Sequence, residues 1–220
     1  MICAIIQARM GSIRLPNKVM KEVLNKPLID YLLERVVKAQ RVDKIILATT
    51  TNLEDDDLAE HVGSLGYDVF RGSENDVLDR YYRCAEKNNL EHIVRITADN
   101  PLIDPRIVDT VVEKYKTGNY DYVSNTLVRT YPYGTEVEVF SFQALEEASN
   151  NAEKPSEREH VTPYFQNNKN KFKISAMKQS ENISYLRWTV DRENDLKFVR
   201  KIATRIKKRP ILMTDIIKLI

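Results

Sequence analysis

The sequence predicts an α/β fold with a mostly parallel sheet that helices cover on both faces. Short apolar segments rich in β-branched residues alternate with longer segments whose apolar residues recur at helical spacing. This alternation is typical of parallel strands joined by crossover helices. The 220 residues are 42% hydrophobic, which is enough for one sizeable core. We therefore expect a single domain.

The first half of the chain has the regular rhythm. The expected strands are short apolar runs, and each expected helix has an apolar stripe. Pro27 suits the first turn of the first helix, and the acidic residues 54–57 suit the positive end of the second. In order, we expect a strand over Ile2–Ala8, a helix over Lys26–Gln40, a strand over Lys44–Thr50, a helix over Leu53–Gly66, a strand over Tyr67–Phe70, a helix over Asp76–Asn89 and a strand over His92–Thr97.

The second half is less regular, and polar loops at 150–155 and 166–171 connect its elements without any internal repeat. Its last helix has the strongest amphipathic pattern. In order, we expect a helix over Pro105–Gly118, strands over Tyr120–Asn125 and Glu136–Phe140, helices over Phe142–Asn150 and Ser156–Asn167, strands over Lys173–Met177 and Leu186–Val190, and a helix over Glu193–Lys207.

Composition excludes several classes of protein. Lys and Arg number 34 against 32 Asp and Glu, so the global basic field of a nucleic-acid-binding protein is missing. No run approaches the roughly 18 apolar residues of a membrane span, and Gln7 and Arg9 interrupt the first apolar stretch, which argues against a signal peptide. Cys3 and Cys84 have no cysteine or histidine at metal-ligand spacing, so we expect buried, reduced thiols in a cytoplasmic protein.

A cationic loop, residues 9–18, follows the first expected strand. Arg9, Arg14 and Lys18 supply fixed positive charge, Gly11 lets the backbone approach a ligand closely, and Ser12 can donate a hydroxyl. This combination suits a polyanion such as a chain of phosphates. A solvated basic loop before a helix is the alternative interpretation.

Two aspartates follow expected strands, and we refer to them as the carboxylate pair. Asp99 comes just after the strand that ends at Thr97, and Asp191 just after the strand that ends at Val190. Ligands of open parallel sheets bind beyond the carboxyl ends of the strands, so we expect the pair and the cationic loop at one edge. Mg²⁺ bound to nucleotide phosphates takes one or two such carboxylates. Alternatively, each aspartate only caps the helix that follows it.

Five segments together resemble a known family. They are Ala4–Lys18, Arg71–Tyr81, Arg95–Asp104, Glu157–Tyr164 and Leu186–Asp191. The chain resembles, over nearly its whole length, the spore-coat-polysaccharide branch of the cytidylyltransferases, which is related to the 3-deoxy-manno-octulosonate and acylneuraminate enzymes that make CMP-activated sugar acids. The resemblance implies a GT-A-like, Rossmann-like nucleotidyltransferase fold, CTP and a sugar acid or related sugar as substrates, Mg²⁺ as cofactor and often a homodimer. It places nucleotide binding in about 1–104 and acceptor and dimer contacts in about 105–220.

The resemblance also assigns roles residue by residue. It implies catalytic roles for Arg14, Lys18, Asp99 and Asp191, with the two aspartates also holding the metal. Nucleotide contacts are implied for Ala8, Arg9, Gly11, Ser12, Arg14, Lys18, Gly72, Ser73, Arg80, Thr97 and Ala98. Contacts with the acceptor are implied for Tyr133, Glu136, Glu138, Arg158 and His160. The acceptor motif of the better-understood sugar-acid enzymes is not recognisable, so the identity of the acceptor stays open.

Three other functions share part of this pattern. A glycosyltransferase of the same broad fold needs an Asp-x-Asp metal motif, but Asp99 is followed by Asn100 and Pro101. A nucleotidyltransferase that uses another nucleoside triphosphate, or a sugar or alcohol phosphate, shares every charge argument. A nucleotide sensor without activity would be expected to lose Lys18 or one of the carboxylates, and this chain keeps them all.

Overall fold

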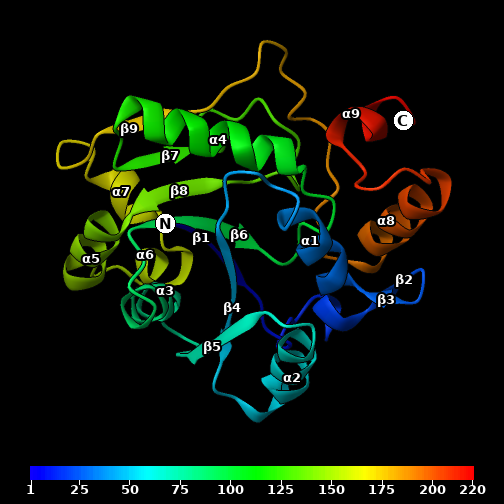
Figure 1. Ribbon diagram of the computed structural model, residues 1–220, viewed down its shortest axis with the longest axis horizontal. Coiled ribbons are helices and arrows are strands. Elements are labelled where there is room, and N and C mark those ends of the chain that lie inside the picture. The colour runs from blue at the N-terminus through cyan, green and yellow to red at the C-terminus, as the bar shows by residue number, and fades with distance from the viewer.

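A computed structural model describes residues 1–220, in which one seven-stranded sheet runs through the molecule (Figure 1). Four neighbouring strands are parallel, β8 is antiparallel to both of its neighbours, and β7 and β9 are parallel. The predicted α/β class with a mostly parallel, mixed sheet is therefore confirmed. Across the sheet the strands are β5 (Asp68–Gly72), β4 (Lys44–Thr50), β1 (Ile2–Gln7), β6 (His92–Thr97), β8 (Glu138–Ser141), β7 (Tyr122–Ser124) and β9 (Ile174–Ala176).

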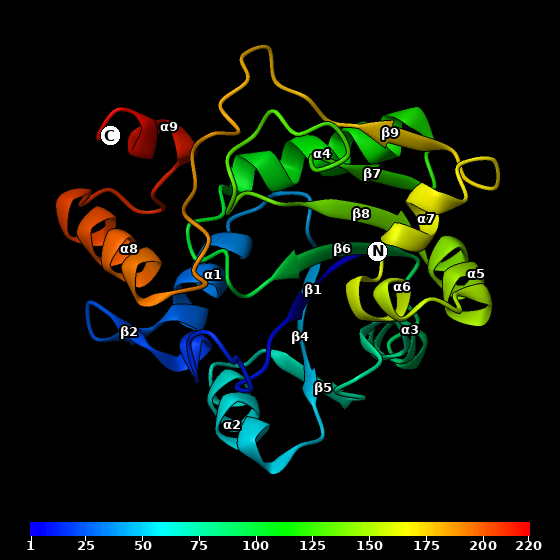
Figure 2. The ribbon, with the colours of Figure 1, turned by 180° about the vertical axis from the view of Figure 1, so that it is seen from behind.

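Helices cover both faces of this sheet because the central strands are apolar on both sides. Ala4 and Ile6 of β1 join a core with α1 (Leu28–Val36), α2 (Asp56–Ser64) and α4 (Pro105–Gly118). The alternate residues Cys3 and Ile5 point to the opposite face and join a second core. Figures 1 and 2 show these two layers from opposite sides. The second core is completed by α3 (Val77–Lys87), α5 (Phe142–Asn151), α7 (Pro163–Asn167) and Val161, which follows α6 (Pro155–His160).

A third apolar cluster lies beside the sheet, where α8 (Glu193–Arg205) and α9 (Met213–Ile217) pack together. It includes Leu15 of the cationic loop and also Trp188 and Val190, which precede Asp191. A two-stranded hairpin, β2 (Glu22–Val23) with β3 (Lys26–Pro27), contributes Val23, and the 3₁₀ helix η1 (Lys18–Met20) connects this hairpin to the loop. Burial of this cluster therefore joins the cationic loop to the C-terminal part of the chain.

Several boundaries differ from the sequence prediction. Segment 186–190 is not a strand of the sheet: it makes one isolated bridge, between Tyr133 and Arg187, and crosses above the end of β6, where the Val190 amide donates to the Asp99 carbonyl at 2.8 Å. The helix expected over 156–167 is two short helices separated by Val161, whose φ of 70° ends the first one. Pro163 then starts the second helix, at a position where its missing N–H costs nothing. The sequence prediction also missed the β2–β3 hairpin and α9, and the helix expected over Leu53–Gly66 begins as the 3₁₀ helix η2 (Leu53–Asp55) before α2.

The longest helix, α4, has 14 residues, and none of the helices has both the length and the apolar character that a bilayer crossing needs.

Candidate active site at the carboxyl ends of the strands

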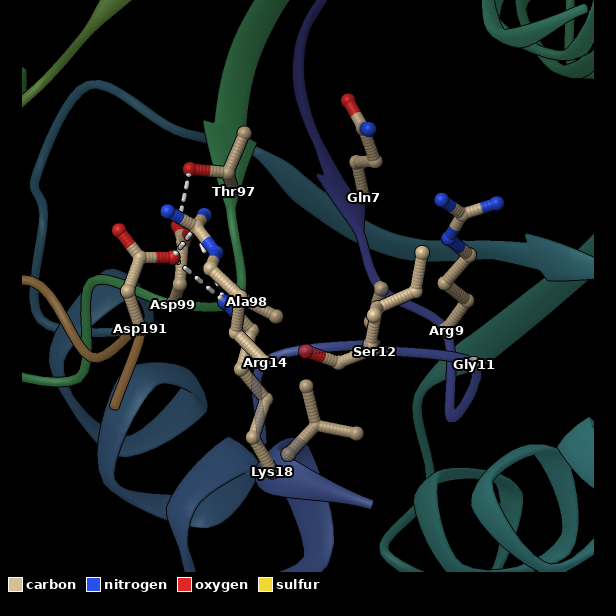
Figure 3. A pocket seen from close by; sticks show the side chains of 13 residues that line it. Gln7, Arg9, Gly11, Ser12, Arg14, Lys18, Thr97, Ala98, Asp99 and Asp191 are labelled. Carbon is tan, nitrogen blue, oxygen red and sulfur yellow. Dashed lines mark hydrogen bonds and ion pairs between the residues drawn. The ribbon is translucent and has the colours of Figure 1, made fainter. Parts of the chain in front are cut away.

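An open hollow of about 430 Å³ lies beyond the carboxyl ends of β1 and β6 (Figure 3). We call it the central pocket. Its wall is formed by the residues that follow these two strands, by the cationic loop and by Asp191. The structure thus brings the loop and both carboxylates to one edge of the sheet. Of the residues singled out in the sequence, Ala8, Arg9, Gly11, Ser12, Arg14, Lys18, Thr97, Ala98, Asp99 and Asp191 all line it.

The carboxylate pair meets the cations of the loop directly. The Lys18 Nζ lies 3.4 Å from Asp99 Oδ2 and 3.3 Å from Asp191 Oδ1, and it donates to the Val190 carbonyl at 2.9 Å. The Arg14 Nη2 donates to Asp191 Oδ1 at 2.8 Å, and the Arg187 Nη2 donates to Asp191 Oδ2 at 2.6 Å. Asp191 therefore has three cationic partners, of which sequence reasoning missed Arg187.

These cations keep Asp191 ionised. Burial alone would raise the pKa of this carboxyl, but Lys18, Arg187 and Arg14 outweigh that effect and hold its pKa below the ordinary value. The carboxylate is thus negatively charged throughout the neutral range. It can accept a metal ion or a hydrogen bond there without first losing a proton.

Asp99 is held in place by its own side chain and by its backbone. The Thr97 hydroxyl donates to Asp99 Oδ1 at 2.6 Å, so Oδ2 is the oxygen that faces Lys18. The Asp99 carbonyl accepts hydrogen bonds from the Val190 amide and the Thr189 hydroxyl, at 2.8 and 3.2 Å. The turn after β6 therefore fixes the segment that carries Asp191, and the two carboxylates keep one relative position.

This donor set suits a divalent cation of the magnesium type. A single ammonium group, that of Lys18, lies within 3.4 Å of both carboxylates, so one cation of that size can contact both. Mg²⁺ requires only one or two protein carboxylates when phosphate oxygens and water complete its shell. No group of three or more His, Cys, Asp or Glu side chains comes together as a metal cluster.

The opposite wall of the central pocket carries Arg9. Figure 3 shows its guanidinium group and Gln7 on one side, and Thr97, the carboxylate pair and the Arg14 head on the other. Arg9 pairs with Glu74 at 3.2 Å. The loop between the two walls passes close to Glu54, because a Cβ on Gly11 would lie 2.6 Å from Glu54 Oε1. The space between the walls is therefore flanked by positive charge at both ends.

Asp55 fixes the start of the cationic loop, and sequence reasoning missed this role. Its side chain is fully buried: Oδ1 accepts from the Met10 amide at 2.6 Å, and Oδ2 accepts from the Thr50 hydroxyl. The sequence suggested only a favourable acidic first turn for the helix. The signal that could have found Asp55 is its helical spacing, because it precedes the apolar Leu58 and Val62 at i, i+3 and i+7 and so shares their buried face.

The second predicted nucleotide segment lies beside the central pocket. Arg80 and His160 line a separate hollow of about 390 Å³ that shares Gln7 and Arg9 with the central pocket. Arg80 itself is 1% exposed, and its Nη1 donates to the Ser73 carbonyl at 2.6 Å. Gly72 packs closely on the Arg80 stem. The structure therefore brings Gly72 at the end of β5, Ser73 after it and Arg80 of α3 together, next to Arg9.

Two of the expected acceptor residues are occupied elsewhere. Arg158 donates to Asp76 and to the Ser149 carbonyl, so it holds α6 against α3 and α5. Glu138 is 4% exposed in β8, where its carboxylate accepts from Arg95 and from the Tyr122 hydroxyl at 2.5 Å. These placements favour structural roles for Arg158 and Glu138 over the expected contacts with an acceptor.

We expect Glu138→Gln to lower the free energy of unfolding by about 2 kcal/mol, because the buried Arg95 guanidinium then loses its counter-charge. The Tyr122 hydroxyl keeps an acceptor oxygen, which limits the loss. Chemical denaturation followed by circular dichroism measures it. Glu86→Gln, on the surface of α3, is the matched control and should leave the unfolding curve unchanged. Equal curves for the two variants would contradict a buried ion pair.

Of the other three acceptor candidates, His160 lines the separate hollow, and Tyr133 and Glu136 lie near the carboxylate pair. Tyr133 is 41% exposed, and its ring is in contact with Arg129 and Arg187. Glu136 accepts from Arg129 at 2.7 Å and from the Gly134 amide at 2.8 Å. Because Arg187 also binds Asp191, this group adjoins the central pocket.

A cationic loop after the first strand and two carboxylates at the same sheet edge, in an α/β fold of this topology, define a nucleotidyltransferase. Similarity to known proteins shows which family of nucleotidyltransferases this is. The chain belongs to the cytidylyltransferase family, whose model matches residues 3–209. It is thus an enzyme of the CTP-dependent nucleotidyltransferases, as the resemblance implied.

Its relatives agree with this placement. The chain is 44% identical over 198 residues to the protein MJ1063 of Methanocaldococcus jannaschii, covering 89% of this chain and 80% of that one. It is 32% identical over 216 residues to the spore coat polysaccharide biosynthesis protein SpsF of Bacillus subtilis, covering 95% and 89%. A solved cytidylyltransferase from Leptospira borgpetersenii superimposes with a TM-score of 0.94 at 32% identity, covering 99% and 92%.

A shorter match extends to the sugar-acid enzymes. The 3-deoxy-manno-octulosonate cytidylyltransferase of Geobacter metallireducens is 33% identical over 113 residues, which is 50% of this chain and 43% of that enzyme. The chain thus spans less than half of that relative. The branch and the relatives that the sequence resembles are confirmed.

Proposed function

We propose that the protein transfers CMP from CTP to a sugar acid or a related sugar, with release of pyrophosphate, in the biosynthesis of a surface polysaccharide or glycan. One observation carries the proposal: the carboxylate pair, Lys18 and Arg14 meet at one wall of the central pocket. The names of the relatives support it, since one acts in spore coat polysaccharide biosynthesis and another activates 3-deoxy-manno-octulosonate with a cytidylyl group. We further propose that the protein is cytoplasmic and forms a homodimer, and light scattering on the purified protein tests the dimer.

Charge repulsion is the main obstacle to this reaction. CTP carries about four negative charges, and the acceptor oxygen must approach its α-phosphorus in line with the departing pyrophosphate. We assign Lys18 and Arg14 to the α- and β-phosphates, because both lie beside the carboxylate pair. Arg9, on the opposite wall, and the backbone near Gly11 would hold the β- and γ-phosphates. Fixed cations of this kind stabilise charge that develops in the transition state.

Asp99 and Asp191 would hold Mg²⁺, as their donor chemistry fits. When bound, the ion neutralises phosphate charge and orients the reacting oxygens. The protein's own part is to keep both carboxylates ionised and in one relative position, through Thr97, Lys18 and the Val190–Asp99 hydrogen bond. No histidine lines the central pocket, so we assign no proton transfer to one.

A pyrophosphate-release assay tests the proposed function. The protein is incubated with Mg²⁺, each nucleoside triphosphate in turn, and a panel of sugar acids and sugar phosphates. We expect release with CTP and a sugar acid. Equal rates with another nucleotide would contradict the choice of CTP, and release only with sugar phosphates would contradict the acceptor class. Transfer of a sugar from a nucleotide sugar, with no pyrophosphate, would instead show a glycosyltransferase.

We expect Asp55→Ala to raise the KM for CTP about 10-fold with a smaller effect on kcat. The Met10 amide and the Thr50 hydroxyl lose their buried acceptor, so the cationic loop loses its fixed starting point. Steady-state kinetics with CTP as the varied substrate measures the change. Asp57→Ala, exposed on the same helix, is the control and should behave like the unaltered protein. A fall in kcat alone would contradict a loop-positioning role.

A further inference from the structure

Arg129, Tyr133 and Arg187 form a group at the rim of the central pocket that we call the arginine platform. The Arg129 Cζ lies 3.9 Å from the centroid of the Tyr133 ring, and the Arg187 Cζ lies 5.8 Å from it. Tyr133 is 41% exposed, and the side chains of Arg187 and Arg129 are 42% and 25% exposed. Two guanidinium groups held on one aromatic ring that solvent reaches suit an anionic group of a small molecule.

The arginine platform is attached rigidly to the segment that ends in Asp191. The Tyr133 amide donates to the Leu186 carbonyl at 3.0 Å, and the Trp188 amide donates to the Tyr133 carbonyl at 2.8 Å. Gly134, with φ of 102°, allows this close approach, because a Cβ there would lie 2.7 Å from the Thr189 nitrogen. An anion on the platform would therefore sit at a fixed place beside Asp191.

The two arginines differ in their present partners. Arg129 pairs with Glu136, a carboxylate outside the central pocket. Arg187 pairs with Asp191 Oδ2, while Arg14 and Lys18 share Oδ1 of the same carboxylate. Asp191 cannot keep three cationic partners and also hold a divalent ion at full strength, because the positive charges repel one another. Of the three, Arg187 is the partner whose guanidinium also has a cation–π contact, with the Tyr133 ring.

We propose that Arg187 exchanges Asp191 for an anionic group of the acceptor once the metal and the nucleotide are bound, and that the arginine platform is the subsite for that group. This inference rests on the proposed function and extends it. The acceptor carries a carboxylate or a phosphate, either of which a guanidinium binds through two parallel hydrogen bonds. The exchange also sets an order: the anion subsite is complete only after the metal–nucleotide complex has released Arg187.

The affinity for Mn²⁺, measured by electron paramagnetic resonance with the methylene analogue of CTP present, tests the exchange without turnover. We expect Arg187→Met to tighten Mn²⁺ binding about 2- to 5-fold, because a competing cation is removed. Arg129→Met is the matched control and should leave Mn²⁺ affinity unchanged, since Arg129 does not touch Asp191. If Arg187 only orients Asp191, the Arg187→Met variant will bind Mn²⁺ more weakly, which would overturn the exchange.

Binding of the acceptor group is tested with two probes, 3-deoxy-manno-octulosonate for a carboxylate and mannose 6-phosphate for a phosphate. Trp188, the chain's single tryptophan, is buried next to Arg187 in sequence and reports binding by its fluorescence. We expect one probe to bind about 10-fold more tightly with Mg²⁺ and the CTP analogue than without them. Both Arg129→Met and Arg187→Met should remove that gain, whereas Tyr133→Phe, which keeps the ring, should retain it. No gain for either probe, or a gain that survives both arginine variants, overturns the subsite.

The Mn²⁺ measurement distinguishes failure of the proposed function from failure of the exchange at Asp191. If the unaltered protein does not bind Mn²⁺ together with the CTP analogue, the proposed function itself fails. If it binds them but the Arg187 and Arg129 variants behave alike toward Mn²⁺, only the exchange at Asp191 fails.

Discussion

Replacement of Lys18 by alanine should lower kcat for CMP transfer by about 10³-fold, which corresponds to about 4 kcal/mol of lost transition-state stabilisation. The Lys18 ammonium is the one cation that reaches both Asp99 and Asp191, and it is also anchored on the Val190 carbonyl. Arg14 and Arg187 contact Asp191 but not Asp99. Steady-state pyrophosphate release at saturating CTP and acceptor measures the loss.

The matched control is Lys21→Ala. Lys21 follows the 3₁₀ helix η1 and does not line the central pocket, so its removal should leave kcat within about twofold. Circular dichroism of the Lys18→Ala variant should show a native fold, because Lys18 lies at the pocket wall and not in any of the three apolar clusters. A Lys18→Ala protein with near-normal turnover would contradict the assignment of Lys18 to the phosphates.

Asp99→Asn should have a loss of similar size, about 10³-fold in kcat, together with loss of Mn²⁺ binding. The asparagine oxygen can still accept from the Thr97 hydroxyl, and the backbone carbonyl still accepts from Val190, so the shape of the site is kept. Only the negative charge is removed. A neutral amide is a much poorer partner for a hard divalent cation than a carboxylate.

Kinetics over a range of Mg²⁺ concentrations distinguishes weaker metal binding by Asp99→Asn from a general loss of active protein. Asp79→Asn, on the surface of α3, is the control and should keep the metal dependence of the unaltered protein. If raised Mg²⁺ fully restored Asp99→Asn to normal turnover, Asp99 would contribute affinity alone and not orientation. An Asp99→Asn variant with unchanged metal dependence would show that Asp99 does not hold the metal.

The regular half of the sheet could be predicted because its signals are local. Strand β1 and helix α4 stand where the apolar pattern places them, and the rule that ligands bind beyond the carboxyl ends of parallel strands correctly put Asp99 beside the cationic loop. The same rule put Asp191 at this edge, and the structure brings it to the same wall although the segment before it is not a strand of the sheet.

The parts that the sequence did not reveal depend on contacts between distant residues. Segment 186–190 has the composition of a strand, but its hydrogen bonds go to Tyr133 and Asp99 and not to a neighbouring sheet strand. The sequence predicted that Glu138 contacts the acceptor. In the structure its carboxylate instead pairs with the buried Arg95 on the neighbouring strand, a contact that the sequence does not show. Arg187 has no local motif, and the helical spacing of Asp55 with Leu58 and Val62 shows its burial but not its distant partner, the Met10 amide.

The third apolar cluster, which unites Leu15 with Trp188 and Val190, has a consequence for biosynthesis. On the ribosome, every strand of the seven-stranded sheet is translated before Asp191 emerges. A nascent polypeptide can therefore build its β-sheet before Asp191 has joined the central pocket. The central pocket is therefore completed after the sheet, when α8 and the segment before Asp191 pack against Leu15 of the cationic loop.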